Sequence, residues 1–223
     1  MARRIPTCDR CPRLRAYCRE VARVKKRAYR DWAYWGRPVP GFGDPAATLV
    51  LVGLAPAAHG GNRTGRIFTG DRSGDWLYGA LHRHGFASQA ESVSRDDGMK
   101  VEGAYITAAG RCAPPGNRPT PVELARCRPY LAEELSALGR ARVVMALGSV
   151  AWEAVLRVWS EQGHTIPRPR PRFGHGAVAR ISGDVPILLG SYHPSQQNTQ
   201  TGKLTRAMFD AVFQSAKTLI AEE

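Results

Sequence analysis

The chain has 223 residues, 43% of them hydrophobic, and it carries 32 Lys and Arg against 19 Asp and Glu, which gives a formal net charge of +13. This length fits one domain with a sizeable core, and the charge favours a polyanionic partner, nucleic acid above all, over the alternative of a merely soluble basic protein. No apolar stretch of about 18 residues is present to span a membrane, and the start, MARRIPTCDRC, lacks the apolar segment of a secretory signal.

Short apolar runs alternate with helical patterns along the chain. A first helix is predicted over residues 13–27, within an N-terminal segment of residues 1–35. Beyond it we predict buried strands at 47–56, 103–111, 141–148 and 185–194, and helices at 73–85, 119–139, 149–163 and about 202–222. Continuous apolar runs of this kind suit a parallel sheet covered on both faces. The pattern predicts an α/β fold, in which residues 1–223 form a single three-layer α/β/α domain around a mainly parallel four-stranded sheet.

Polar and glycine-rich stretches follow three of the predicted strands. GLAPAAHGGNRTGRIFTGD (53–71) follows the first strand, RCAPPGN (111–117) the second and HPSQQNTQTG (193–202) the fourth. Ligands of open α/β sheets bind beyond the carboxyl ends of the strands. We therefore expect these three stretches to build the functional site.

Five cysteines in a chain without an export signal favour metal or redox chemistry over disulfides. Cys8 and Cys11 form a C-x2-C pair, and Cys112 and Cys127 form a C-x14-C pair. Four thiolates suit either a [4Fe–4S] cluster or zinc, the spacing does not choose between them, and separate buried thiols are the alternative. Cys18 is expected to serve packing. If the four thiols gather, they tie the basic N-terminal segment to the end of the second strand.

Together these motifs resemble the uracil-DNA glycosylase superfamily, and most closely its family 5, the iron–sulfur double-stranded uracil-DNA glycosylases. The resemblance spans roughly residues 8 to 210, and its motifs are RPVPGFGDP (37–45), residues 53–71, RCAPPGNRPTP (111–121), YHPSQQNTQTGKLT (192–205) and the four cysteines. It implies a [4Fe–4S] cluster held by Cys8, Cys11, Cys112 and Cys127. It also implies an enzyme that flips a deaminated base out of double-stranded DNA and hydrolyses its N-glycosidic bond, leaving an abasic site. We expect a monofunctional, monomeric enzyme in the cytoplasm of a bacterium or archaeon, associated with the nucleoid through DNA.

Cleavage of an N-glycosidic bond builds positive charge on the sugar and negative charge on the departing base. Asp71, at the end of RIFTGD, is the candidate carboxylate for the sugar or for a positioned water, and a helix N-terminal acid is the alternative. His193, at the end of the fourth strand, is the candidate donor to the base, and a satisfied strand-end histidine is the alternative. Asn117 resembles a family residue near the pocket, where it holds the water or a base edge, or else closes a turn.

The base pocket is expected around Phe68, which stacks on the flipped base or else belongs to the core. Residues at or just beyond the ends of the first two strands complete it, and these are Gly53, Ala55, Pro56, Ala57 and Ala108. Family 4 relatives carry an acidic residue and a uracil-reading asparagine where this chain has Leu54 and Ala108. An asparagine side chain would lose its hydrogen bonds when a base other than uracil entered the pocket, whereas Ala108 has none to lose. We therefore predict broad specificity, for uracil first and then for hypoxanthine, xanthine or mismatched thymine.

Two segments are expected to grip DNA without reading its sequence. A flexible, basic loop after the first strand offers Asn62, Arg63 and Arg66 to phosphates. The uncharged polar stretch after His193, together with Lys203, is expected to hold phosphates and to fill the gap left by the flipped nucleotide. The members of this stretch are Ser195, Gln196, Gln197, Asn198, Thr199 and Gln200.

Two functions of other classes remain open on the sequence alone. One is a basic nucleic-acid-binding module with structural zinc, which is colourless and keeps its DNA affinity when Asp71 is changed. The other is an iron–sulfur electron carrier, in which the basic surface and the His193 loop have no role. The sequence does not show whether Asp71 or Asn117 acts as the base, positions the water or stabilises charge.

Overall fold

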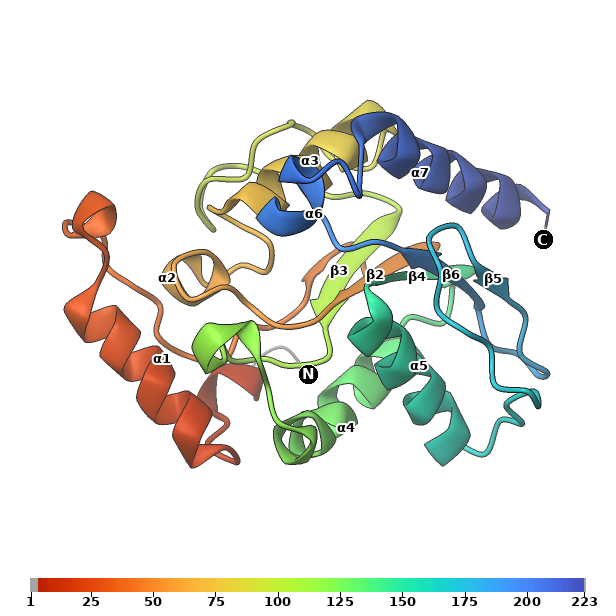
Figure 1. Cartoon of the computed structure of the whole chain (residues 1–223), viewed down its shortest axis with the longest axis horizontal. Helices are drawn as coiled ribbons and strands as arrows, with labels where there is room; N and C mark the ends of the chain where they lie inside the picture. Colours follow the sequence, from red (N-terminus) through yellow and green to blue (C-terminus); the bar gives the residue numbers. More distant parts are fainter. Residues whose placement is uncertain (1–3, 223) are drawn as a thin grey trace.

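The computed structural model describes residues 4–222. At its centre four strands run parallel in the order β3, β2, β4, β6. They are β2 (Leu49–Gly53), β3 (Ala104–Ala108), β4 (Val143–Leu147) and β6 (Ile187–Ser191). Each lies inside one of the four predicted strands, and helices flank the sheet on both sides (Figure 1), so the predicted α/β fold is confirmed.

The sheet is wider than predicted. Within residues 4–222 it has six strands, because β1 (Phe42–Gly43) pairs antiparallel with β3 at one edge and β5 (Val178–Ala179) pairs antiparallel with β6 at the other. Two-residue strands carry no periodic apolar pattern, so the neighbouring strand and not local propensity decides their pairing. The prediction of four strands therefore holds for the parallel core alone.

Four helices cover the sheet, two on each face (Figure 1). α3 (Arg72–Arg83) and α7 (Arg206–Ala221) pack on one face, and α4 (Pro121–Ala137) and α5 (Ser149–Glu161) pack on the other. The ends of these helices differ from the predicted ends by a few residues. α7 begins at Arg206 because the hydroxyl of Thr205 caps it by accepting a hydrogen bond from the N–H of Met208 (3.2 Å).

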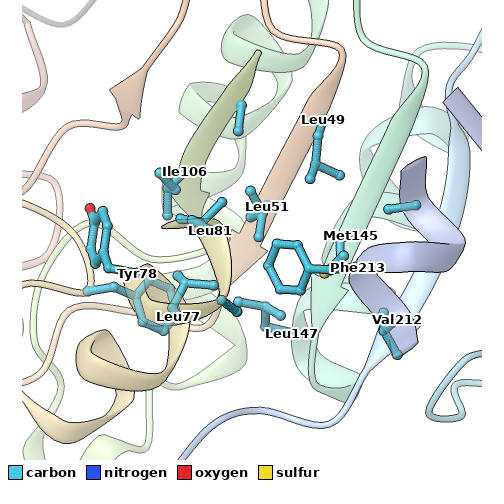
Figure 2. Close-up of a cluster of buried hydrophobic side chains, with 14 of the residues drawn as sticks. Leu49, Leu51, Leu77, Tyr78, Leu81, Ile106, Met145, Leu147, Val212 and Phe213 are labelled. Carbon is cyan, nitrogen blue, oxygen red and sulfur yellow. The ribbon is translucent and has the colours of Figure 1, made fainter. Parts of the chain in front are cut away.

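The core follows the alternation of side chains along each strand. In β2, Leu49 and Leu51 point to the α3 and α7 side, while Val50 and Val52 point to the α4 and α5 side. Figure 2 shows Phe213 of α7 packed beside Leu51 within the first of these clusters. Both faces of the sheet are thus buried, which leaves the strand ends to carry function.

The remaining helical segments do not cover the sheet, and all except α1 are short. They are η1 (Ile5–Thr7), α1 (Pro12–Val24), η2 (Arg27–Tyr29), α2 (Gly61–Thr64), η3 (Pro115–Asn117) and α6 (Gln196–Gln200). α1 confirms the predicted N-terminal helix, while residues 1–3 and 223 of the predicted domain lie outside the described residues. No helix in the described part of the chain is both long and apolar enough to cross a membrane.

Candidate active site

The connection from β2 to α3 places Asp71 directly before α3. Its Oδ1 accepts a hydrogen bond from the backbone N–H of Gly74 (3.0 Å), so the carboxyl caps the helix, as the alternative interpretation expects. Its Oδ2 lies against Gly60, where a Cβ would be only 1.9 Å from that oxygen. A side chain at position 60 would therefore displace the carboxyl, and glycine is required there.

Asp71 lines a cavity of about 550 Å³ together with Asn117, His59 and Gln196. The volume suits a small-molecule fragment such as a base and its sugar. Asn117 is exposed, has a left-handed backbone (φ 57°), and closes a turn through its N–H to the carbonyl of Pro114 (3.1 Å). The structure thus brings two of the three predicted catalytic residues to one cavity, and the turn interpretation of Asn117 also holds.

The environment of Asp71 alters its acidity. Burial raises the pKa of its carboxyl, and hydrogen bonds from the N–H groups of Gly74 and Ser73 oppose the rise. The nearby Asp75 adds to the rise, whereas Arg63 opposes it. When ionised, a buried carboxylate of raised pKa is a better proton acceptor than an ordinary one, and its charge is screened less by water.

His193 follows β6 and lies beside Phe68, with ring centroids 5.6 Å apart and ring planes tilted by 31°. Burial lowers the pKa of His193 to about 4, so the ring is neutral at neutral pH and has one N–H to donate. It lines a second cavity of about 270 Å³, which Leu54 and Lys203 also line. Asp71 and His193 therefore line different cavities, and Phe68, which lies beside His193, lines neither of them.

Phe68 has a left-handed backbone (φ 52°), which residues other than glycine rarely adopt. Its ring covers Gly53, where a Cβ would lie 2.6 Å from the ring, and its carbonyl lies 1.9 Å from where a Cβ of Gly74 would be. Ala108 is buried and pairs with Gly53 across β2 and β3. The side chain belongs to the core, as the alternative interpretation of Phe68 expects, and its ring lies beside His193, while stacking on a flipped base stays a prediction.

The other predicted pocket residues lie between β2 and α2. Ala55 and Ala57 are half-buried, and Pro56 is buried. Ala57 lines the Asp71 cavity, whereas Ala55 and Pro56 line neither this cavity nor that of His193.

The prediction that Asn62, Arg63 and Arg66 form a flexible DNA-binding loop is wrong. The first two belong to α2, and all three side chains are buried. Arg63 donates from Nε to the carbonyl of His59 (2.7 Å) and from Nη2 to the carbonyl of Gly70 (2.8 Å). These side chains hold the loop from inside, so they are not available to phosphates.

Arg66 ties this loop to a distant segment. Its Nη2 lies 2.6 Å from Oδ2 of Asp97 and 2.6 Å from Oγ of Ser92, and its Nε donates to Oγ1 of Thr69 (2.9 Å). Although burial opposes the shift, the Arg66 guanidinium and three backbone N–H groups lower the pKa of Asp97 to about 2. The ion pair therefore stabilises the folded loop.

Arg66→Ala is expected to lower the free energy of unfolding by about 3 to 5 kcal/mol, because it leaves the Asp97 carboxylate buried without its partner. Urea unfolding measures this loss. The matched control is Arg95→Ala, which removes an exposed pair with Asp96 and should cost at most about 1 kcal/mol. Equal losses in the two variants would contradict the structural role of Arg66.

The polar stretch after His193 forms a short helix, α6, and not an extended segment. Ser195 caps it by accepting a hydrogen bond from the N–H of Asn198 (3.3 Å), and Nδ2 of Asn198 donates to the carbonyl of His193 (2.9 Å). The hydroxyl of Thr199 donates to the carbonyl of Ser195 (3.2 Å). Part of the predicted DNA contact surface is thus used internally, and the predicted DNA-contact side chains that remain exposed are Gln196, Gln197, Gln200 and Lys203.

Cys8, Cys11, Cys112 and Cys127 line one small cavity, although they come from two distant parts of the chain. Burial raises the pKa of Cys11 and raises that of Cys127 to about 12, and neighbouring thiols contribute to both rises. Thiols that resist ionisation in this way become thiolates when a cationic centre binds among them. In the described residues, no three His, Cys, Asp or Glu side chains are grouped to hold a metal ion.

The cavity of the four cysteines also contains a spare donor. The backbone N–H of Arg111 donates to Sγ of Cys127 (3.2 Å), and Arg111 itself lines the cavity. Its Nε is buried without a hydrogen-bond partner among residues 4–222. An unpaired N–H beside thiols suits an electron-rich group, such as the sulfides of a cluster. Cys18 is buried in the same apolar cluster and its thiol donates to the carbonyl of Ala113 (3.5 Å), so its packing role stays a prediction that the burial agrees with.

Sequence reasoning missed His59 and Arg111. His59 lines the Asp71 cavity, and its Nδ1 forms a hydrogen bond with the hydroxyl of Tyr34 (3.0 Å). Burial lowers the pKa of His59, and the nearby Lys26 and Arg63 add to this effect. The only sequence signal for His59 is its place between two alanines and two glycines, which does not distinguish it from a loop histidine.

The chain is similar to proteins of known family along most of its length. Residues 40–217 match the family model described as the uracil DNA glycosylase superfamily. The type-5 uracil-DNA glycosylase of Mycobacterium tuberculosis is 51% identical over 98% of this chain and 80% of its own length. That of Thermus thermophilus is 51% identical over 96% of this chain and 94% of its own length. A type-4 uracil-DNA glycosylase of Archaeoglobus fulgidus is 31% identical over 70% of each chain.

Proposed function

Because this chain belongs to the uracil-DNA glycosylase superfamily, we propose that it removes uracil and a wider set of deaminated bases from double-stranded DNA. Its similarity to type-5 enzymes along nearly its whole length makes it a hydrolase of N-glycosyl bonds. This activity argues against a binding module without catalysis and against an electron carrier. The finer points, which are the lesion range, the duplex preference and the release of an intact abasic site, are our proposals.

The observation that carries the mechanism is the Asp71 carboxyl on the wall of its cavity, fixed between Gly60 and the N–H of Gly74. When the C1′–N bond breaks, the base departs with the electron pair and positive charge develops on the sugar. A carboxylate beside C1′ stabilises that charge. It also accepts a proton from the water whose oxygen bonds to C1′, and that proton then passes to the departed base anion, so that the products are an abasic site and the neutral base.

His193 and Phe68 are proposed to act on the base. A neutral imidazole N–H stabilises the negative charge that gathers on a carbonyl oxygen of the departing base. Since burial holds the pKa of His193 at about 4, this donor needs no protonation at neutral pH. The ring of Phe68 offers the base a flat apolar face next to His193. Asn117, on the Asp71 cavity, is proposed to hold the water.

The broad lesion range is supported by the small, apolar residues at the ends of β2 and β3, which are buried, with Gly53 directly behind the ring of Phe68. Gly53 and Ala108 pair there, and Ala108 has no polar group to be left unpaired by a purine. The pocket thus accepts uracil, hypoxanthine, xanthine and mismatched thymine with modest discrimination.

Scission of labelled duplexes tests this proposal. Each duplex carries one uracil, hypoxanthine, xanthine or mismatched thymine, and hot alkali after incubation cleaves the strand at any abasic site. We expect cleavage of several lesions, fastest at uracil, and no cleavage before the alkali treatment. Activity on uracil alone would end the claim of breadth, and cleavage without alkali would end the claim of a monofunctional enzyme.

We also propose that Cys8, Cys11, Cys112 and Cys127 hold a [4Fe–4S] cluster, supported by their shared cavity and by the unpaired Nε of Arg111. Bound there, the cluster supplies a covalent staple between the N-terminal helix and the end of β3, with no part in bond cleavage. The exposed side chains of Gln196, Gln197 and Lys203 are proposed to contact the duplex. A monomer suffices for an isolated lesion, and relatives from bacteria and archaea support work on cytoplasmic DNA.

A further inference from the structure

Residues 25–35, KKRAYRDWAYW, carry four basic and four aromatic side chains that the proposed chemistry does not use. We call this segment the basic arm. It follows α1 at one edge of the molecule, away from the sheet (Figure 1). Lys26, Arg27 and Arg30 are exposed, and within residues 4–222 none of the three forms an ion pair with an acidic side chain.

The arm is fixed to the loop that carries the candidate catalytic carboxylate. The guanidinium carbon of Arg63 lies 3.9 Å from the ring centre of Tyr29 and 4.1 Å from that of Trp32. The same guanidinium donates to the carbonyl of Gly70, the residue before Asp71. Cation–π contacts of this geometry are favourable, and more so where water is excluded, as around the buried Arg63. Arg63 thus joins the arm to the Asp71 loop.

The arm also forms part of the Asp71 cavity. Lys26 and Tyr29 line that cavity, and the hydroxyl of Tyr34 bonds to His59 on its wall (3.0 Å). A nucleotide whose sugar lies at the Asp71 carboxylate leaves its two phosphates at the mouth of this cavity. The unpaired cations of the arm lie on the segment that borders this mouth.

We propose that the basic arm binds the phosphate backbone of duplex DNA beside the nucleotide that enters the Asp71 cavity. This inference rests on the proposed function for the identity of the DNA. Each cation that neutralises a phosphate releases counterions, so binding through the arm strengthens steeply as salt is lowered. Because Tyr29 and Trp32 already hold the arm against Arg63, little chain entropy is lost on binding.

The test compares two triple variants with the same change in charge. The arm variant is Lys26→Gln, Arg27→Gln and Arg30→Gln. The control variant is Lys100→Gln, Arg140→Gln and Lys217→Gln, three exposed cations before β3, before β4 and late in α7, which lie away from the carboxyl ends of the strands. The probe is a fluorescein-labelled duplex with a tetrahydrofuran abasic-site analogue, and its anisotropy gives Kd at several salt concentrations.

We expect the arm variant to bind roughly 10- to 100-fold more weakly near 0.1 M salt, and its slope of log Kd against log salt to fall by about 2 to 3. The control variant should stay within about threefold of the wild type. A third variant, Lys26→Arg with Arg27→Lys and Arg30→Lys, should restore binding if charge is what matters. Equal Kd and equal slopes in the arm and control variants would overturn the proposal. If the wild type failed to cleave uracil, the proposed function would be lost. The same comparison of Kd between the arm and control variants, made with an undamaged duplex, would still show whether the arm binds DNA.

Discussion

Asp71→Asn is expected to lower the single-turnover rate of uracil excision by about 1,000-fold, because it removes the negative charge beside C1′. The fold should survive the change, since the Asn side-chain oxygen can still accept the hydrogen bond from the N–H of Gly74. The measurement is single-turnover kinetics with enzyme in excess over a uracil duplex, together with a melting curve. A helix cap alone would give a small kinetic effect.

Asp75→Asn is the matched control. Asp75 lies in the first turn of the same helix, four residues later, and lines neither the Asp71 cavity nor the His193 cavity. Its variant should excise uracil within about twofold of the wild type and lose at most about 1 kcal/mol of helix stabilisation. Similar rate losses in the Asp71 and Asp75 variants would contradict the catalytic role of Asp71.

The raised pKa of Asp71 sets the expected pH dependence. The rate should fall on the acid side at a pH above the ordinary aspartate range of about 3.9, because the carboxylate is protonated there. His193, with a pKa of about 4, should add no change between pH about 5 and 8. The raised pKa of Asp71 also affects stability. In the folded protein the carboxyl binds its proton more tightly than in the unfolded chain, so it stabilises the fold fully below its unfolded pKa, and this stabilisation is lost as the pH rises through its folded pKa. Asp71→Asn should therefore keep or raise the melting temperature at neutral pH.

Cys127→Ser is expected to abolish iron binding, because it removes one of four thiols that line a single cavity. Wild-type protein purified without oxygen should contain about four iron atoms per chain and a visible absorption that dithionite bleaches, whereas the variant should be colourless. Loss of the staple should lower the melting temperature by roughly 5 to 10 °C. Iron analysis, sulfide analysis and calorimetry measure these effects independently of activity.

Cys18→Ala is the control for this experiment. The Cys18 thiol is buried close to the four but does not line their cavity. Its variant should keep full iron content and lose about 1 kcal/mol through the missing sulfur. Stoichiometric zinc in place of iron in the wild type would sink the cluster proposal and leave the four cysteines as a structural zinc site.

The parallel core could be predicted because its strands are short, continuous apolar runs bounded by glycine and proline. β2 is an example, with five buried residues in sequence, a pattern that only a sheet covered on both faces explains. The edge strands β1 and β5 could not be predicted, because two residues hold no periodicity. Their pairing depends on the backbone of β3 and β6, which local sequence does not encode.

The candidate site could be predicted in position but not in detail. Asp71, Asn117 and His193 all lie beyond strand ends, as parallel topology requires. Their division between two cavities depends on how the loops after β2, β3 and β6 pack against one another, which no spacing reveals. The basic loop failed as a DNA surface because Arg66 pairs with Asp97, thirty-one residues later. Composition detects the charge of an arginine, but not the partner that buries it.

The helix α4 is held to the sheet in two independent ways, and both involve Arg111. The backbone N–H of Arg111 bonds to Cys127, while its guanidinium forms a buried ion pair with Glu134 (2.5 Å), two turns further along α4. Thr107 of β3 also donates to Glu134. The second attachment involves no thiol, so it persists when iron is scarce. Protein without the proposed cluster would then keep α4 on the sheet and the basic arm against Arg63, ready to be loaded.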